Sequence, residues 1–261
     1  MPASTPHLES VTRMPEPRPL TRCPIVEALI DLRVSAAEHV VGDAFDATAA
    51  DMQKRGYSRK GSIREQRVLV TAGPDAMQHS STESLIGTRF HSADERFVAQ
   101  FTTQGFTVSR LQPYIDWNGL VTEALALWHI YCAVARPSTV GRVATRYINE
   151  LVLPGEPVLP LSEYLRAAPS MPADVASPPA NFLQRYVVHD RETGAQAIVI
   201  QARQRPDTAE GIPVLLDLDC FVERPFESNG ASAFAMLAQL RNLKNRLFFG
   251  LVTDLTLRLY E

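Results

Sequence analysis

Segments in which apolar and polar residues alternate constrain the fold most strongly, because alternation places one kind of side chain on each face of a β-strand. In residues 23–34, every even position from 26 to 34 is apolar, whereas Glu27, Asp31 and Arg33 fall on the opposite face. Residues 140–153 alternate in the same way. Both segments are therefore predicted to be strands with one buried face and one wet face.

Further strands are predicted where runs rich in β-branched and aromatic residues end at turn-forming residues. These runs cover residues 64–71, 85–91, 96–102, 106–111, 182–189, 195–203 and 213–222. Most of the connections between them are short. Short connections between sequential strands favour an antiparallel meander.

A first amphipathic helix is predicted between the strand of residues 23–34 and Gly56. Ser35 and Glu38 have the spacing of a capping box at its start, and the helix is expected to run to Arg55. Its predicted buried stripe includes Val40, Val41, Ala44, Phe45, Thr48 and Met52.

Two longer helices are predicted further along the chain. Residues 117–135 follow Asp116, a good N-cap residue, and residues 231–251 form the long C-terminal helix. Two shorter helical turns are expected, one within residues 161–166 and one beginning at Thr253 or Asp254.

This order of elements predicts an α+β fold, in which a curved antiparallel sheet has its helices packed on one face. A saddle like that of the TATA-binding protein and a START-type helix-grip fold both have this form. Residues 1–20, with five prolines, are predicted to be a flexible arm, and residues 21–261 to be a single domain. The segment 154–180 contains seven prolines and is expected to be a long loop or a junction between two pseudo-repeated halves.

Composition excludes several functional classes. Apolar residues make up 45% and charged residues 21% of the 261 residues, and the net charge is −3, so we expect a globular chain without general attraction to nucleic acid or anionic membranes. A local basic patch would still permit a nucleic-acid contact. No apolar run approaches the roughly 20 residues of a membrane span, and the N-terminus lacks the apolar core of a signal peptide. Cys23, Cys132 and Cys220 are predicted to be buried free thiols in a cytosolic protein.

The sequence contains none of the common catalytic, cofactor or metal motifs. GxGxxG, GxxxxGK[ST], GxSxG, HExxH and CxxC are all missing from it. We therefore expect no cofactor and no metal ion, and the sequence favours a protein that is not an enzyme without deciding the question.

Three segments together resemble a sporadically distributed bacterial protein family of about this length whose function is unknown. They are residues 24–33 (PIVEALIDLR), residues 146–149 (RYIN) and residues 240–249 (LRNLKNRLFF) followed by Thr253 and Asp254. The resemblance covers nearly the whole chain apart from the proline-rich arm. It implies a bacterial cytosolic protein and assigns no catalytic residues.

Charged residues on the polar faces of the central strands are the first candidates for a site. The set consists of Glu27, Asp31, Arg33, Arg142, Arg146, Glu150, Arg203, Asp217 and Asp219. On a solvated sheet face these residues would form cross-strand ion pairs, each stabilising by about 0.2–1 kcal/mol. On a cupped face, the arginines would bind a phosphate or carboxylate and the carboxylates would bind Mg²⁺.

Residues near the end of the long C-terminal helix are the second candidates. Arg241, Lys244, Asn245, Arg246, Phe248 and Phe249 lie within about two turns of each other. A solvated helix face explains the charges, and contact with an acidic partner is the functional alternative. Because adjacent helical residues point about 100° apart, one of the two phenylalanines is expected to mark an interface or to cover a neighbouring strand.

These observations lead to one main hypothesis and two alternatives. The main hypothesis is a non-catalytic binding or regulatory protein that acts through protein contacts, as an oligomer or a subunit of a complex. The first alternative is an enzyme or binding protein that uses the charged strand face for a phosphorylated small molecule with Mg²⁺. The second is a START-like protein that holds an apolar ligand between the sheet and the C-terminal helix.

Overall fold

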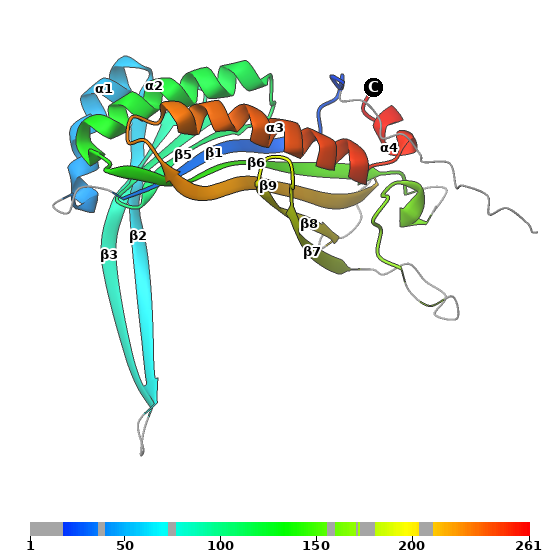
Figure 1. Cartoon of the computed structure of the whole chain (residues 1–261), viewed down its shortest axis with the longest axis horizontal. Helices are drawn as coiled ribbons and strands as arrows, with labels where there is room; N and C mark the ends of the chain where they lie inside the picture. Colours follow the sequence, from blue (N-terminus) through cyan, green and yellow to red (C-terminus); the bar gives the residue numbers. More distant parts are fainter. Residues whose placement is uncertain are drawn as a thin grey trace, which may run out of the picture.

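The structure is a computed structural model that describes residues 18–35, 40–72, 77–155, 160–170, 172, 181–203 and 211–261. In these residues the chain forms one nine-stranded antiparallel sheet with the order β2-β3-β4-β5-β1-β6-β9-β8-β7 (Figure 1). The strands are β1 (Ile25–Ser35), β2 (Tyr57–Ala72), β3 (Met77–Ser92), β4 (Phe97–Thr102), β5 (Gly105–Leu111), β6 (Thr139–Leu153), β7 (Phe182–His189), β8 (Gln196–Arg203) and β9 (Ile212–Phe226).

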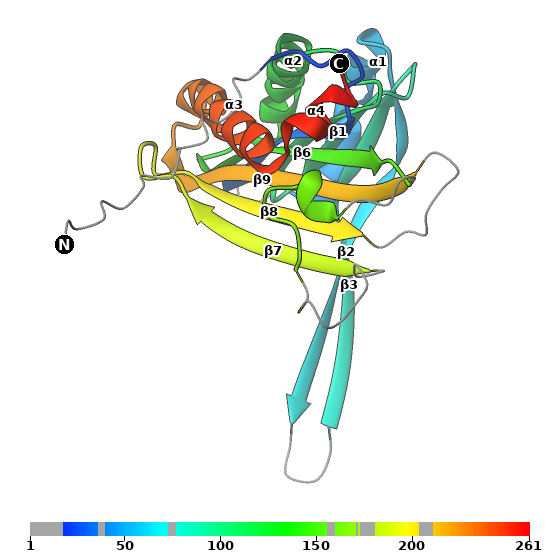
Figure 2. The same ribbon diagram turned by 90° about the vertical axis from the view of Figure 1, so that its right-hand side faces the viewer.

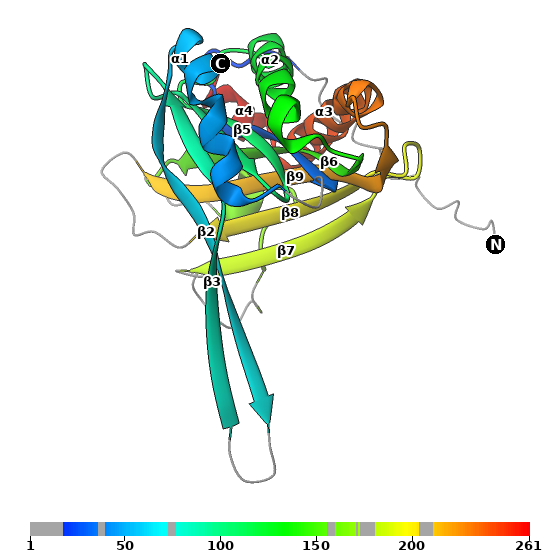
Figure 3. The same ribbon diagram turned by 90° about the vertical axis from the view of Figure 1, so that its left-hand side faces the viewer.

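The helices gather on one face of this sheet (Figures 1 and 3). They are α1 (Ala49–Lys54), α2 (Trp117–Ala135), α3 (Ala231–Leu251) and α4 (Asp254–Arg258), with 3-10 turns η1 (Gly42–Thr48) and η2 (Leu161–Glu163). The predicted α+β class, the antiparallel sheet and the long C-terminal helix are confirmed. None of the helices in the described ranges is long and apolar enough to cross a membrane.

The strand order mirrors about the central pair of β1 and β6. Moving outward, β1 is followed by β5, β4 and β3, and β6 is followed by β9, β8 and β7. In each direction a three-strand meander leads into a long helix, α2 after β5 and α3 after β9. The open, curved sheet thus has the form of a saddle whose centre lies beneath both long helices (Figure 1).

The core lies between the sheet and the helices. The alternate residues Ala28, Ile30 and Leu32 of β1 are fully buried against the helices, as the alternation predicts. Trp128 and Tyr131 of α2 are also fully buried, and their rings stack with centroids 5.3 Å apart. Aromatic side chains contribute a large share of apolar burial, so this cluster anchors α2 to the sheet.

The prediction for the first helix is wrong about where the helix starts and about one residue expected to be buried. Ser35 is the last residue of β1 rather than a helix cap, the α-helix begins only at Ala49, and the predicted capping residue Glu38 lies outside the described residues. Val41, expected to be buried, is 61% exposed. The chain enters a 3-10 turn at Gly42 because its backbone presses on β3: a Cβ at this position would lie 2.3 Å from the carbonyl oxygen of Leu85.

β2 and β3 are about twice as long as predicted. Both contain 16 residues, paired continuously from Tyr57 with Ser92 to Ala72 with Met77 apart from small register shifts. Beyond the body of the protein they project as a two-stranded arm (Figures 1 and 2). The residues added to the predicted strands are 57–63 of β2 and 77–84 of β3, and these are mostly polar, so no apolar alternation signals the extra length.

A candidate ligand-binding site

The charged strand face forms a ladder of ion pairs on the sheet face opposite the helices. Arg142 of β6 lies opposite Arg33 of β1 and Glu223 of β9 in register, and its guanidinium reaches along these strands to Asp31 and Asp219. Its Nη1 donates to Asp31 Oδ1 over 3.0 Å, and its Nη2 donates to Asp219 Oδ2 over 2.9 Å. Desolvation raises the pKa of Asp219, and the neighbouring guanidinium of Arg142 opposes that rise.

A second pair completes this ladder. Arg146 binds Asp217 through two parallel hydrogen bonds, of which Nε to Oδ1 measures 2.8 Å. The Asp217 carboxylate raises the pKa of Arg146. Asp31 also accepts from Arg33 Nε over 3.0 Å and from Thr107 Oγ1 over 2.8 Å. The ladder carboxylates are therefore bound to the chain's own arginines, as expected for a cross-strand ion-pair network.

Not all predicted members belong to this ladder. Glu27 and Glu150 lie on the same face by register, but Arg203 does not. The odd-numbered residues of β8, such as Ala197 and Val199, lie on the face of the sheet that the helices cover. Arg203 shares this face, so it does not join Arg142 and Arg146 in one binding site. No group of three His, Cys, Asp or Glu side chains suited to a metal ion occurs in the described residues. The Mg²⁺ alternative thus finds no ligand set on this part of the sheet.

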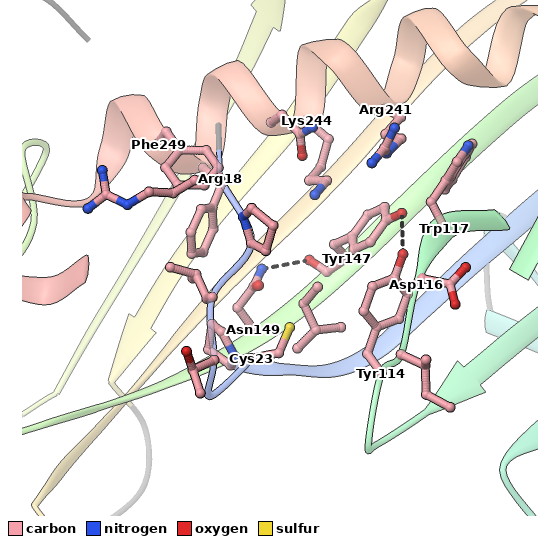
Figure 4. Close-up of a pocket in the computed structure, with 18 residues that line it drawn as sticks. Arg18, Cys23, Tyr114, Asp116, Trp117, Tyr147, Asn149, Arg241, Lys244 and Phe249 are labelled. Carbon is pink, nitrogen blue, oxygen red and sulfur yellow. Dashed lines mark hydrogen bonds between the residues drawn. The ribbon is translucent and has the colours of Figure 1, made fainter. Parts of the chain in front are cut away.

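A pocket of about 490 Å³ lies between α3 and the centre of the sheet (Figure 4). Its walls come from four places: the segment before β1, the loop between β5 and α2, strand β6 and helix α3. They include Arg18, Cys23, Tyr114, Asp116, Trp117, Tyr147, Asn149, Arg241, Lys244 and Phe249. The sequence places these residues far apart, and the central β1–β6 pair brings them together beneath α3.

Two cations enter this pocket from α3. The Lys244 ammonium lies 4.1 Å from the ring centroid of Tyr147, and the Arg241 guanidinium lies 5.6 Å from that of Trp117. Both side chains point from the helix toward the sheet (Figure 4). Burial, assisted by the charge of Arg241, lowers the pKa of Lys244 to about 8.

Neither cation has a carboxylate partner in the described residues. The one carboxylate among the lining residues is Asp116, which accepts from the Gly119 backbone N–H over 2.8 Å and so caps α2. A third cation at the rim, Arg18, forms an ion pair with Glu261. Among the described residues the pocket thus holds two cations without a carboxylate partner, in contrast to the paired arginines of the ladder.

Neutral polar groups complete the pocket. The hydroxyls of Tyr114 and Tyr147 lie 3.4 Å apart, and burial raises the pKa of both phenols. They consequently stay protonated near neutral pH. Asn149 is buried, and its Nδ2 donates to the Leu216 carbonyl over 2.9 Å. The sequence patterns singled out neither the two tyrosines nor Trp117, and their one signal for the pocket was the basic pair of Arg241 and Lys244.

The second group of candidates divides between two places. Arg241, Lys244 and Asn245 line the pocket, whereas Arg246 pairs with Asp190 over 2.9 Å and with Glu192 over 3.4 Å. Arg246 thus ties α3 to the β7–β8 turn.

Of the two alternatives for the phenylalanines of α3, the exposed interface aromatic is not found and the buried, covering position is. Phe248 and Phe249 are each only 6% exposed, and their rings meet edge to face with centroids 5.3 Å apart. Both rings belong to a buried cluster that includes Leu257 of α4 and Leu161 of η2, and the chain after η2 is bonded to the C-terminal end of α3.

The cysteines follow their prediction only in part. All three are free thiols. Cys220 is buried and Cys132 is half-buried, but Cys23 is exposed, because it precedes β1 at the mouth of the pocket.

Fold and site together define an α+β protein with an open antiparallel sheet and a cationic pocket under its C-terminal helix. Compared with known proteins, the chain matches no family model, and no curated protein is similar enough to count as a relative. The resemblance to a bacterial family therefore stays a prediction, and the functional argument depends on the geometry of the pocket.

Proposed function

We propose that the protein binds a small organic anion in the pocket between α3 and the sheet. The observation that carries this proposal is the pair of cations, Arg241 and Lys244, that faces the pocket without a carboxylate partner among the described residues. Lys244 is partly buried, and a desolvated cation without a counter-ion is costly, so a bound anion would supply the missing charge, with Arg241 as the more exposed second cation. The cytosol suits this proposal, because the exposed thiol of Cys23 stays reduced there.

The size and the walls of the pocket narrow the ligand class. About 490 Å³ lies within the range of small-molecule sites, roughly 300–1,000 Å³. Phe248, Phe249 and Trp117 provide an apolar surface beside the cations, and the phenols of Tyr114 and Tyr147 provide neutral hydrogen bonds. An aromatic or aliphatic carboxylate fits these walls better than a wholly apolar molecule, which would leave both cations without a partner.

Calorimetric titration with aromatic and aliphatic carboxylates, together with matched neutral amides, tests the proposal. Arg241→Gln and Lys244→Met should each weaken carboxylate binding about tenfold or more, because a charge-assisted hydrogen bond contributes about 1.5–3 kcal/mol. Arg246→Gln is the matched control, since it removes the same charge from the same helix outside the pocket. Equal binding of acids and amides, or equal losses in all three variants, would contradict the proposal.

A second candidate function rests on the arm of β2 and β3. An isolated two-stranded ribbon is marginal in water, and Val68 near its outer end is 61% exposed. We propose that this arm gains order by contact with a protein partner or a second copy of the chain. Light scattering on the purified full-length chain and on Val68→Glu tests this: assembly that the variant abolishes supports the arm contact. A wild-type chain that is monomeric and captures nothing from cell extract contradicts it.

A further inference from the structure

We infer that Lys244 forms a reversible imine with a ligand that carries a carbonyl group beside its acidic group, such as a 2-oxo acid or an aldehyde acid. In this arrangement Arg241 holds the carboxylate while the Lys244 amine meets the carbonyl carbon. The inference builds on the proposed anion-binding function and names the ligand class of the same pocket.

Lys244 differs from every other lysine of the chain. The sequence contains only three lysines among its 26 basic residues. The other two are exposed and ion-paired: Lys54 Nζ lies 2.7 Å from Asp51 Oδ1, and Lys60 Nζ lies 2.8 Å from Glu95 Oε1. Lys244 alone has no hydrogen-bond acceptor or carboxylate in the described residues and instead faces an aromatic ring in a pocket.

The groups around Lys244 favour its neutral, nucleophilic form. Arg241 on its own helix repels the ammonium, and the walls of the pocket desolvate it. Cys220 on β9 and Cys23 before β1 face Lys244, and they raise its pKa only when their thiols are ionised. The phenols of Tyr147 on β6 and Tyr114 stay neutral. With a pKa of about 8, roughly a tenth of the amine is neutral at pH 7, whereas less than about a thousandth of an ordinary lysine is. A desolvated lysine beside a second cation is an established way to activate an amine.

The proposed reaction needs no oxidant or cofactor. The nitrogen lone pair attacks the carbonyl carbon, a C–N bond forms, and the carbonyl π electrons move to oxygen, which takes up a proton. The nitrogen loses a proton to give a carbinolamine. Protonation of its hydroxyl then allows the C–O bond to break and water to leave, and the nitrogen lone pair forms the C=N bond. Addition of water reverses each step, so the ligand is captured and released unchanged.

Reductive trapping on the full-length protein tests the inference, with 4-carboxybenzaldehyde as the probe and cyanoborohydride as the reductant. Peptide mass spectrometry should find a secondary amine at Lys244 at least tenfold more often than at Lys54 or Lys60. Trapping at Lys244 should rise between pH 6.5 and 8.5, and benzaldehyde, which lacks the acid, should label it less. Lys244→Arg should abolish this adduct, and Lys54→Arg should leave it unchanged.

The outcomes separate the two proposals. If 4-carboxybenzoate and 4-carboxybenzaldehyde both bind but Lys244 is labelled no more than Lys54, the imine is wrong and the anion site stands. If neither acid binds and no lysine is preferred, both proposals fail. Circular dichroism of Lys244→Arg shows whether a lost adduct reflects a lost fold, and a folded variant that still gives the same adduct overturns the assignment.

Discussion

The two basic clusters of this protein use the same residue types in opposite ways. On the open face of the sheet, Arg142 and Arg146 lie opposite carboxylates that the neighbouring strands supply. Under α3, Arg241 and Lys244 face aromatic rings instead. The arginines of the ladder are therefore already paired with carboxylates, whereas the two cations of the pocket are not. A bound anion would supply a partner only in the pocket.

This difference arises from the elements that carry the residues. Strands β1, β6 and β9 meet in a fixed register that puts these side chains on one face, so each arginine of the ladder reaches an acid offset along a neighbouring strand. The pocket lies where a helix crosses strands, and no such repeating opposition exists there. The partner of a cation that projects from α3 is therefore the side chain that lies beneath it on the sheet, which for Lys244 is the ring of Tyr147.

The largest predicted effect comes from breaking the ladder. Arg142→Ala should lower the free energy of unfolding by about 3–5 kcal/mol, because it leaves Asp31 and Asp219 with buried charge and a lost partner. Urea unfolding followed by circular dichroism measures it. Arg33→Ala is the control: Arg33 is 53% exposed and shares Asp31 with Arg142, so its loss should cost less than about 1 kcal/mol. Equal losses would show that the ladder is not the ordered network described above.

The corresponding change in the pocket should cost little. Lys244→Met keeps the length and apolar stem of the side chain and removes a charge without a partner, so stability without ligand should stay within about 1 kcal/mol of wild type or rise. The same urea experiment measures it. A loss above about 2 kcal/mol would mean that Lys244 holds the fold together, and the contrast between the two clusters would collapse.

The pH dependence sharpens this contrast. The folded-state pKa of Lys244 is about 8 and lies below that of an unfolded lysine, so folding carries a penalty at pH values where the amine is charged in both states. That penalty fades as pH rises from about 8 toward the unfolded value of roughly 10.4, and the stability of wild type should gain on Lys244→Met over this window. The raised pKa of Tyr147 acts in both proteins, whereas the charge of Lys244 lowers the pKa values of Cys220 and Cys23 and this coupling is lost in Lys244→Met, so both proteins are compared over the full pH range. A difference that is flat with pH would contradict the lowered pKa.

A further small effect is predicted for the tyrosine pair. Tyr147→Phe keeps the ring beneath Lys244 and removes only a 3.4 Å contact between hydroxyls, so unfolding should become easier by about 0.5–1.5 kcal/mol. Carboxylate affinity, measured by calorimetry, should change less than in Lys244→Met. If Tyr147→Phe abolishes binding, the ligand depends on the phenol rather than on the cations.

The sequence predicted where several helices and strands begin and end, but it did not predict which of them contact one another. Helices 117–135 and 231–251 and the strand 182–189 end at the predicted residues, because N-caps, turns and periodicity are local signals. The inner half of β2 (residues 57–63) and the outer half of β3 (residues 77–84) were missed, since both are mostly polar and show no apolar alternation.

The candidate site depended on long-range pairing that periodicity does not encode. Arg142 meets Asp31 and Asp219 across 111 and 77 residues of chain, and parity within one strand could not tell whether Arg203 shares a sheet face with Arg142. Arg241 and Lys244 were found as a basic pair, but nothing local indicated that Tyr147 and Cys23 lie beneath them. Residue types were thus predictable, and the division between paired and unpaired charge was not.

The arm also has a mechanical consequence. β3 is one continuous strand that begins in the arm and ends inside the sheet, where Phe90 is fully buried and pairs with Ala99 of β4. Sixteen residues of strand span about 50 Å, so a force applied at the outer end acts through a long lever on this buried ring. A partner bound to the arm would therefore transmit force along β3 to the layer of side chains on which α2 packs. A force applied at the surface would then reach the interior of the protein.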